Sequence, residues 1–130
     1  MDFTLTKYKE LIVALKAHYN SFQTYQEFLE APASKSIVLR HDVDLLPQNS
    51  LEFAKIQAKN NIKGSYYFRA VPESWDETII KEIASLGHEI GYHYECLTTC
   101  NGNIDKAIQD FDKNLKALRA LVPVKTICMH

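Results

Sequence analysis

The segment HDVDLLP, residues 41–47, crowds a histidine and two aspartates together one residue after the apolar run SIVL. Like charges this close repel each other, and burying them is costly unless something pairs with them. A bound cation, a hydrogen-bond network or solvent at the end of a strand would each reduce that cost. The chemistry available to Asp42 and Asp44 therefore depends on which other residues the fold brings beside them.

Ionisable side chains also stand at the ends of three later apolar segments. They are Arg69 in GSYYFRA (64–70), His93 and Glu95 in GHEIGYHYE (87–95), and His130 in VKTICMH (124–130). Parallel α/β proteins place their chemistry at the carboxyl ends of their strands. If these segments are parallel strands, their carboxylates and imidazoles meet Asp42 and Asp44 at one rim, and the crowding belongs to a functional site. The alternative is an acidic strand end in solvent.

The order of the segments predicts a parallel sheet with helices packed on it. Apolar and aromatic runs predict strands near residues 37–42, 64–69, 88–93 and 124–129, with helices between them. Two further helices precede the first strand. Because strands and helices alternate, we expect an α/β fold with a single domain over residues 1–130. His88 and Glu89 begin their strand at the opposite rim, and we expect them to be structural.

Local sequence signals mark where several helices begin. Thr24 and Glu27 form a capping-box pattern for a short helix. Pro47 is well placed to open the next helix, because proline is favoured at the first helical position. Ser74 and Glu77 show the capping pattern again, ahead of a helix that Gly87 should end.

The overall composition is ordinary for a soluble globular protein. The formal net charge is −1, and no cluster of lysines and arginines offers a surface for nucleic acid. No apolar run approaches the roughly 20 residues of a membrane span, and the first ten residues lack the pattern of a signal peptide. Three cysteines without a secretory signal predict reduced thiols and a cytoplasmic location.

The segments IVLRHDVD, GSYYFRA and GHEIGYHYE resemble, in order and spacing, the polysaccharide deacetylases of carbohydrate esterase family 4, which share the NodB-homology domain. GHEIGYH is similar to the family segment that leads to its metal-binding histidines. HDVD is similar to the first motif of a divergent branch. The resemblance covers residues 36–130 and implies the first half of a distorted parallel (β/α) barrel, about four strands, preceded by the N-terminal helices.

The resemblance implies metal-assisted hydrolysis of a non-peptide C–N bond, the acetamide of an N-acetylated sugar or polysaccharide. By position, Asp42 matches the general base, while Asp44 and His93 match ligands of a divalent metal, expected to be zinc, with cobalt or nickel as alternatives. Such a metal polarises the carbonyl, and the carboxylate removes a proton from water. Arg69 is expected either to orient a carboxylate at the catalytic centre or simply to pair with one.

The chain departs from the family pattern at two places. Leu97 stands four residues after His93, where the family has its second ligand histidine, and Met129-His130 stands where many members have an Arg-x-Pro-Tyr motif. His41 or His130 would complete the ligand set, and we predict His130; otherwise the site binds metal weakly or not at all. The alternative function is a non-catalytic relative that serves as a binding or structural module.

The length of the chain raises a further expectation. A full barrel of this type takes about 250 residues, so we expect the sequence to be a fragment truncated at its C-terminus. Four parallel strands leave two open edges and an inner face that we expect to be apolar, on the strands that carry Val38, Tyr67, Ile90 and Ile127. We therefore expect either a homodimer through the open sheet face or an open, flattened sheet.

Overall fold

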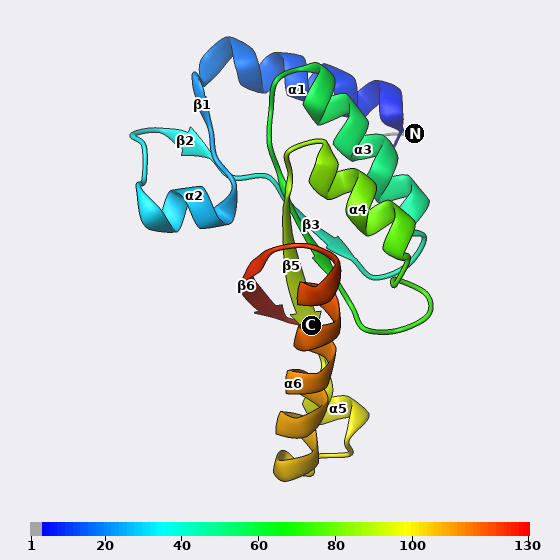
Figure 1. The fold of residues 1–130 in the computed structure, drawn as a ribbon. Coiled ribbons are helices and arrows are strands. Elements are labelled where there is room, and N and C mark those ends of the chain that lie inside the picture. Colours follow the sequence, from blue (N-terminus) through cyan, green and yellow to red (C-terminus); the bar gives the residue numbers. More distant parts are fainter. Residues whose placement is uncertain (1–3) are drawn as a thin grey trace.

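A four-stranded parallel sheet lies at the centre of the computed structural model, which describes residues 4–130 (Figure 1). Strands β3, β4, β5 and β6 lie side by side in sequence order, and each neighbouring pair is parallel. The α/β fold and the four parallel strands predicted from the sequence are therefore confirmed. A second sheet, formed by the two short parallel strands β1 and β2, was not predicted.

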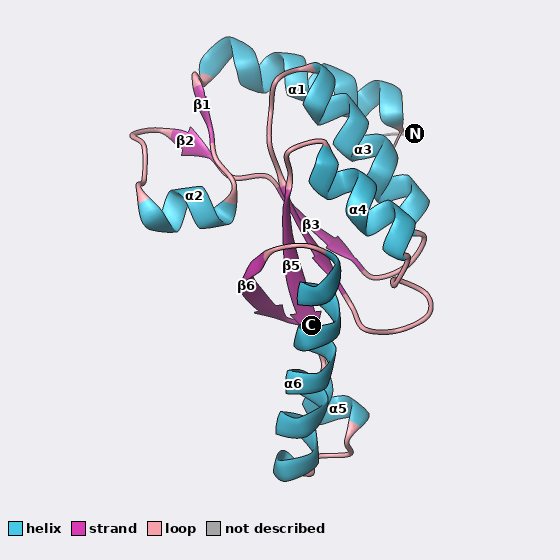
Figure 2. Ribbon diagram, in the orientation of Figure 1, coloured by secondary structure: helices cyan, strands magenta, loops and turns pink. Residues whose placement is uncertain are grey.

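Figure 2 shows how strands and helices alternate along the chain. The strands are β1 (Ser21–Phe22), β2 (Ser36–Ile37), β3 (Arg40–Val43), β4 (Ser65–Phe68), β5 (Glu89–Tyr94) and β6 (Val124–Met129). The helices are α1 (Leu5–His18), α2 (Tyr25–Glu30), α3 (Pro47–Lys59), α4 (Glu77–Ser85), α5 (Cys96–Thr99) and α6 (Ile104–Leu121). In the described part of the chain, no helix is both long and apolar enough to cross a membrane.

Of the strand predicted over residues 37–42, only residues 40–42 lie in the large sheet, because the structure divides this segment in two. Ser36 and Ile37 pair with Ser21 and Phe22 in the small sheet, whereas β3 begins at Arg40 in the large one. The division depends on pairing with a segment 15 residues away, since Ser21 Oγ and Ser36 Oγ also lie 3.0 Å apart. A local run of apolar residues carries no sign of that pairing.

The helix termini confirm two of the local signals and correct a third. Thr24 N donates to Glu27 Oε2 at 3.0 Å and Glu27 N donates to Thr24 Oγ1 at 3.1 Å, which is the predicted capping box. Pro47 is the first residue of α3. The predicted cap at Ser74 is wrong, because Asp76 Oδ1 accepts the two backbone N–H groups that begin α4, each at 3.0 Å.

The crossover helices α3, α4 and α6 pack against one face of the sheet and form the main core with it (Figure 1). Because the strands follow one another in sequence order, right-handed connections place every crossover helix on the same side. Large core side chains from the strands and helices include Val43, Tyr66, Phe68, Ile90, Tyr92, Val124, Leu51, Ile79, Ile80, Ile83 and Leu118. The whole opposite face of the sheet is thus left for other groups.

That opposite face is polar, which corrects the expectation of an apolar inner face. Arg40 pairs there with Asp42, and the Arg40 guanidinium carbon lies 5.3 Å from the centre of the Tyr67 ring. Glu89 is buried on this face and accepts hydrogen bonds from side chains of the two neighbouring strands. Ile90 packs instead with the helices. A homodimer through this face would therefore bury mainly polar groups.

Helix α2 covers the amino end of the polar face. Tyr25 N, in its first turn, donates to Ser65 Oγ at 2.8 Å, and Gln26 N donates to Glu89 Oε2 at 3.1 Å. The Glu89 carboxylate is therefore satisfied by the first turn of α2 and by the sheet, as a structural residue should be. The carboxyl end of the sheet stays uncovered by α2.

Candidate metal centre

Asp44, His93 and His130 meet at the carboxyl end of the sheet. Asp44 follows β3, His93 lies in β5 and His130 follows β6. One ligand atom from each residue lies within 4.8 Å of the other two. Three strand ends that are far apart in the sequence thus supply one cluster of candidate ligands, because the strands run parallel and end at the same rim.

His93 is held through the ring nitrogen that does not face the cluster. Its Nδ1 lies 3.2 Å from the carbonyl oxygen of Cys128, on the neighbouring strand β6. A carbonyl oxygen can only accept, so Nδ1 carries the proton of this hydrogen bond and Nε2 presents a lone pair. This Nε2 lies 3.6 Å from Asp44 Oδ1, and His93 is only 3 % exposed. The ring is therefore fixed in the orientation of a metal ligand.

His130 approaches Asp44 in the same way. Its Nε2 lies 3.4 Å from Asp44 Oδ1, while its Nδ1 lies 3.5 Å from Glu95 Oε2. Its backbone N–H donates to the carbonyl oxygen of Tyr94 at 2.9 Å, which continues the pairing of β6 with β5. A carboxylate thus faces each ring nitrogen, and with the proton on Nδ1, toward Glu95, Nε2 is free to bind a cation beside Asp44.

Asp44 Oδ1 is the atom that most needs a partner. It is buried and accepts no hydrogen bond, although nearly half of the Asp44 side chain is exposed. Within residues 4–130, no other buried side-chain oxygen or nitrogen lacks a partner. Buried polar atoms almost always have one. Nε2 of His93 and Nε2 of His130 both face this oxygen, and a cation between them would satisfy all three groups.

The donor set and its dimensions fit a divalent transition metal. A carboxylate oxygen and two imidazole nitrogens, with further positions open, are typical ligands of catalytic zinc. A tetrahedral site with bonds of about 2.0–2.1 Å separates its ligand atoms by about 3.4 Å. The two nitrogen–oxygen distances measured from Asp44 Oδ1 are 3.6 and 3.4 Å. The two distances from Asp44 thus match a tetrahedral site, and the ligand atoms of all three residues lie within 4.8 Å of one another.

Asp42, the predicted general base, lies beside the cluster. Its Oδ2 is 3.9 Å from His93 Nε2. Arg40 Nε and Nη2 donate to its two oxygens, each at 2.8 Å. A carboxylate has about four lone-pair sites, so this bidentate pair fixes the direction of Asp42 and still leaves acceptor positions for a water molecule.

Arg69, predicted as a catalytic residue, holds two groups behind the ligands. Its Nε and Nη2 donate to the two oxygens of Glu95 at 2.6 and 3.0 Å. Its Nη1 donates to the carbonyl oxygen of Asp44 at 3.1 Å. Hydrogen bonding to Arg69 holds the pKa of Glu95 below its usual range. Arg69 thus pairs with a carboxylate, that of Glu95, beside the cluster.

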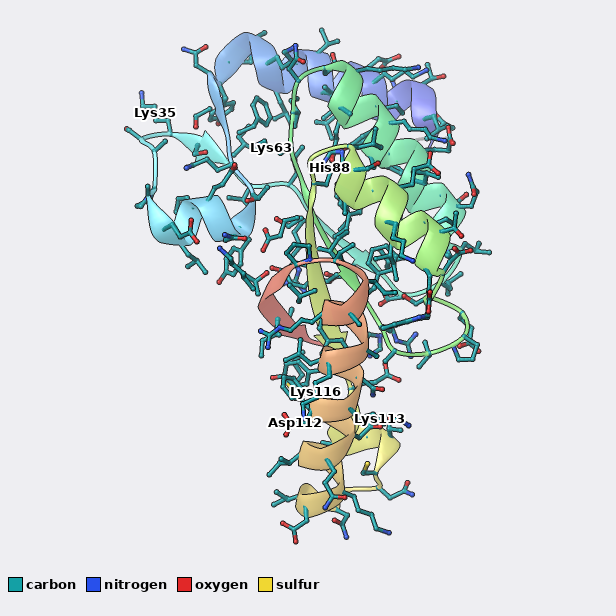
Figure 3. The ribbon with its side chains drawn as sticks, viewed as in Figure 1. Lys35, Lys63, His88, Asp112, Lys113 and Lys116 are labelled. Atoms are coloured by element: carbon teal, nitrogen blue, oxygen red, sulfur yellow. The ribbon has the colours of Figure 1, made fainter. Side chains whose placement is uncertain are left out.

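His41 lies outside the cluster, which corrects the alternative that it completes the ligand set. Its Nε2 is 2.6 Å from Gln57 Nε2, and its ring stacks on Tyr66 with centroids 4.5 Å apart, on the helix side of the sheet. His88 lies at the amino end of β5, away from the cluster (Figure 3). Its Nδ1 accepts a hydrogen bond from Gly64 N at 3.0 Å, so it has the structural role expected.

Two residues, Glu95 and Ser74, were given no role at the site from the sequence, and Ser74 was predicted only as a helix cap. Glu95 was placed at the rim only, although its spacing of two residues from His93 could have indicated a contact with the same site. Ser74 is fully buried; its Oγ accepts from Arg69 N at 3.0 Å and donates to the carbonyl oxygen of Val43. Leu97, at the family position of the second histidine, is an exposed residue of α5.

Comparisons of the chain with protein-family models, with curated proteins and with solved structures found no match. The case for a function therefore rests on the geometry of the Asp44, His93 and His130 cluster and on the chemistry of the residues around it.

Proposed function

We propose that the chain is a metal-dependent hydrolase of non-peptide C–N bonds that removes acetyl groups from an N-acetylated sugar or polysaccharide. The observation that carries the proposal is the buried Oδ1 of Asp44, which has no hydrogen-bond partner and faces Nε2 of His93 and of His130. The substrate class is proposed from the resemblance of three segments to polysaccharide deacetylases. Sequential parallel strands with helices on one face support a partial (β/α) barrel of that type.

The residues of the site divide into a ligand set and a base. Asp44, His93 and His130 would hold the metal, which we propose to be zinc, with cobalt or nickel as alternatives. When bound, the metal supplies a Lewis acid that polarises the acetamide carbonyl and activates water. Asp42, held in place by Arg40, removes the proton from the attacking water as general base.

A binding partner and a cellular location are also proposed. An N-acetylated carbohydrate is the proposed partner, because an acetamide carbonyl is the group that the metal and Asp42 together would attack. A cytoplasmic location is proposed from the cysteine content. The three cysteines, Cys96, Cys100 and Cys128, are all free thiols.

Acetate release tests the proposed reaction. The protein, loaded in turn with Zn²⁺, Co²⁺ and Ni²⁺, is incubated with acetylated chitooligosaccharides and with acetylated nucleotide sugars. We expect release of acetate that Asp42→Asn lowers about 100-fold or more, because an amide cannot accept the proton of water. Metal affinity should stay within about twofold, because Asp42 is outside the ligand set. Asp105→Asn, an exposed change in α6, is the matched control and should leave the rate unchanged.

The same assay separates the enzyme from its alternative. Metal binding with no acetate above the Asp42→Asn background on any substrate would favour a non-catalytic binding module. A protein that binds none of the three metals would contradict both the site and the proposed enzyme.

A further inference from the structure

The ion pair between Arg69 and Glu95 contacts two residues of the proposed ligand set, Asp44 and His130. Glu95 contacts the ring of His130 with the same oxygen, Oε2, that accepts from Arg69 Nε. Arg69 donates from its remaining terminal nitrogen to the backbone carbonyl of Asp44. The pair therefore connects Asp44, which follows β3, with His130, which follows β6 and pairs with the end of β5.

We infer that Glu95 and Arg69 are positioning residues for the metal: Glu95 sets the proton of His130 on Nδ1, and Arg69 fixes the backbone that presents Asp44. This inference rests on the proposed metal site. It assigns both residues a function through the ligands rather than through the substrate.

The tautomer of His130 depends on the groups that face its two ring nitrogens. A neutral histidine binds a metal through the nitrogen that lacks a proton, and the partner of the other nitrogen decides which one that is. For His93 that partner is a backbone carbonyl, which no side-chain change removes. For His130 it is the carboxylate of Glu95, 3.5 Å from Nδ1. Asp44 Oδ1 faces the other nitrogen, Nε2, at 3.4 Å, so Glu95 is the side chain that draws the proton away from the nitrogen that would bind the metal.

The planar guanidinium of Arg69 suits the three hydrogen bonds that it donates. Three of its donors serve three different acceptors, namely both oxygens of Glu95 and the carbonyl of Asp44. Only a planar guanidinium presents donors in such a fixed fork, and a lysine ammonium cannot reproduce it. The pair is also mostly shielded from water, with 21 % of the Arg69 side chain and 18 % of the Glu95 side chain exposed.

The contacts that Glu95 and Arg69 make with the ligand residues distinguish them from a purely structural ion pair. Such a pair needs no contact with a ligand. Glu95 and Arg69 each direct a further contact to a ligand residue, the ring of His130 and the backbone of Asp44. Partners of this kind orient ligands, and their removal typically lowers metal affinity about 10- to 100-fold.

The test combines a metal titration with a measurement on the metal-free protein. Titration of the protein with Zn²⁺ and Co²⁺ should give affinities about 10- to 100-fold weaker for Glu95→Ala than for wild type. Glu95→Gln, which keeps the size of the side chain, and Arg69→Lys should weaken binding several-fold. Glu82→Ala is the matched control, because Glu82 pairs with Lys55 on the helix layer, away from the rim. It should leave the affinity unchanged.

Nitrogen–proton correlation spectra of the histidine rings, recorded without metal at a fixed neutral pH, test the tautomer directly. We expect a larger share of the His130 proton on Nδ1 in wild type and in Glu82→Ala than in Glu95→Ala, where Asp44 is the carboxylate that still faces the ring. Unchanged metal affinity in Glu95→Ala and Arg69→Lys, or a His130 tautomer that ignores Glu95, would overturn the inference. Absence of metal binding by wild type would instead refute the proposed function, while the tautomer would still decide the role of Glu95.

Discussion

His93 and His41 lie on the two faces of one sheet, and the face decides what each ring does. His93 lies at the carboxyl end of β5, on the polar face, with Nε2 toward Asp44. His41 faces the helices, where it contacts Gln57 and stacks on Tyr66. Burial there lowers the pKa of His41 to about 4. At neutral pH this histidine is therefore an uncharged packing residue.

Because of this shift, we predict that His41 makes stability depend on pH between about 4 and 6.5. As the pH falls through 6.5, the unfolded chain binds a proton at His41 and the folded protein does not until the pH approaches 4. The free energy of unfolding should therefore fall with decreasing pH in this window, by at most about 3.5 kcal/mol at about 1.4 kcal/mol per pKa unit. Urea unfolding at pH 7 and pH 4.5 measures the change.

His41→Asn is the control, because asparagine keeps an acceptor for Gln57 and does not titrate. The variant should lose less stability than wild type between the two pH values, whatever its stability at pH 7. Equal losses in the two proteins would show that His41 does not carry this pH dependence.

At the scale of elements, Ser74 joins the loop after β4 to the end of β3. Its buried Oγ accepts from Arg69 N and donates to the carbonyl oxygen of Val43, the residue before Asp44. We predict that Ser74→Ala lowers the free energy of unfolding by about 1–3 kcal/mol, because two buried backbone groups lose their partner. Ser85→Ala, which removes an exposed hydroxyl bonded to a helix carbonyl, should change it by less than about 0.5 kcal/mol. Equal effects of the two substitutions in chemical denaturation would contradict this account of Ser74.

Gly91 allows β5 to lie under an aromatic ring of β4. A Cβ atom added to Gly91 would lie 2.3 Å from Cε1 of Tyr67, which is only 1 % exposed. We predict that Gly91→Ala costs about 1–3 kcal/mol of stability, because the ring has to move within a packed layer. The cost should shrink in a Tyr67→Leu background, where the smaller side chain leaves room. Thermal unfolding of the four proteins measures this coupling, and an equal cost in both backgrounds would contradict it.

The sequence predicted most of the elements because their signals are local. The capping box at Thr24 and the proline at the start of α3 depend only on neighbouring residues, and both are present. The role of Ser74 depends on a carbonyl 31 residues away, so its local resemblance to a cap was misleading. The sequence also did not show which side chains of β4 face the helices, because all four of its residues are buried and the pattern shows no alternation.

Part of the candidate site was predictable for a different reason. Parallel strands end at one rim, so the clustering of Asp44, His93 and His130 follows from strand order alone once each strand is located. Which histidine turns toward Asp44 depends on the face of the strand and on partners such as the carbonyl of Cys128. These partners come from pairing across the sheet, and a single sequence does not reveal them.

At the scale of the whole molecule, the sequential strand order separates packing from chemistry. Helices α3, α4 and α6 bury the apolar face of the sheet, and α2 covers the amino end of the polar face. The carboxyl end of that polar face carries the Asp44, His93 and His130 cluster with Asp42 beside it. This arrangement brings charged residues together without disturbing the core, and it is the basis of the proposed metal site.

Calorimetric titration of the purified protein with Zn²⁺ tests that site most directly. We predict one ion bound per chain, with an affinity that Asp44→Ala, His93→Ala and His130→Ala each lower at least about 100-fold, because each variant removes one of three ligands. His18→Ala, at the exposed end of α1, should bind like wild type. Weak binding that is equal in all five proteins would contradict a metal centre at the carboxyl end of the sheet.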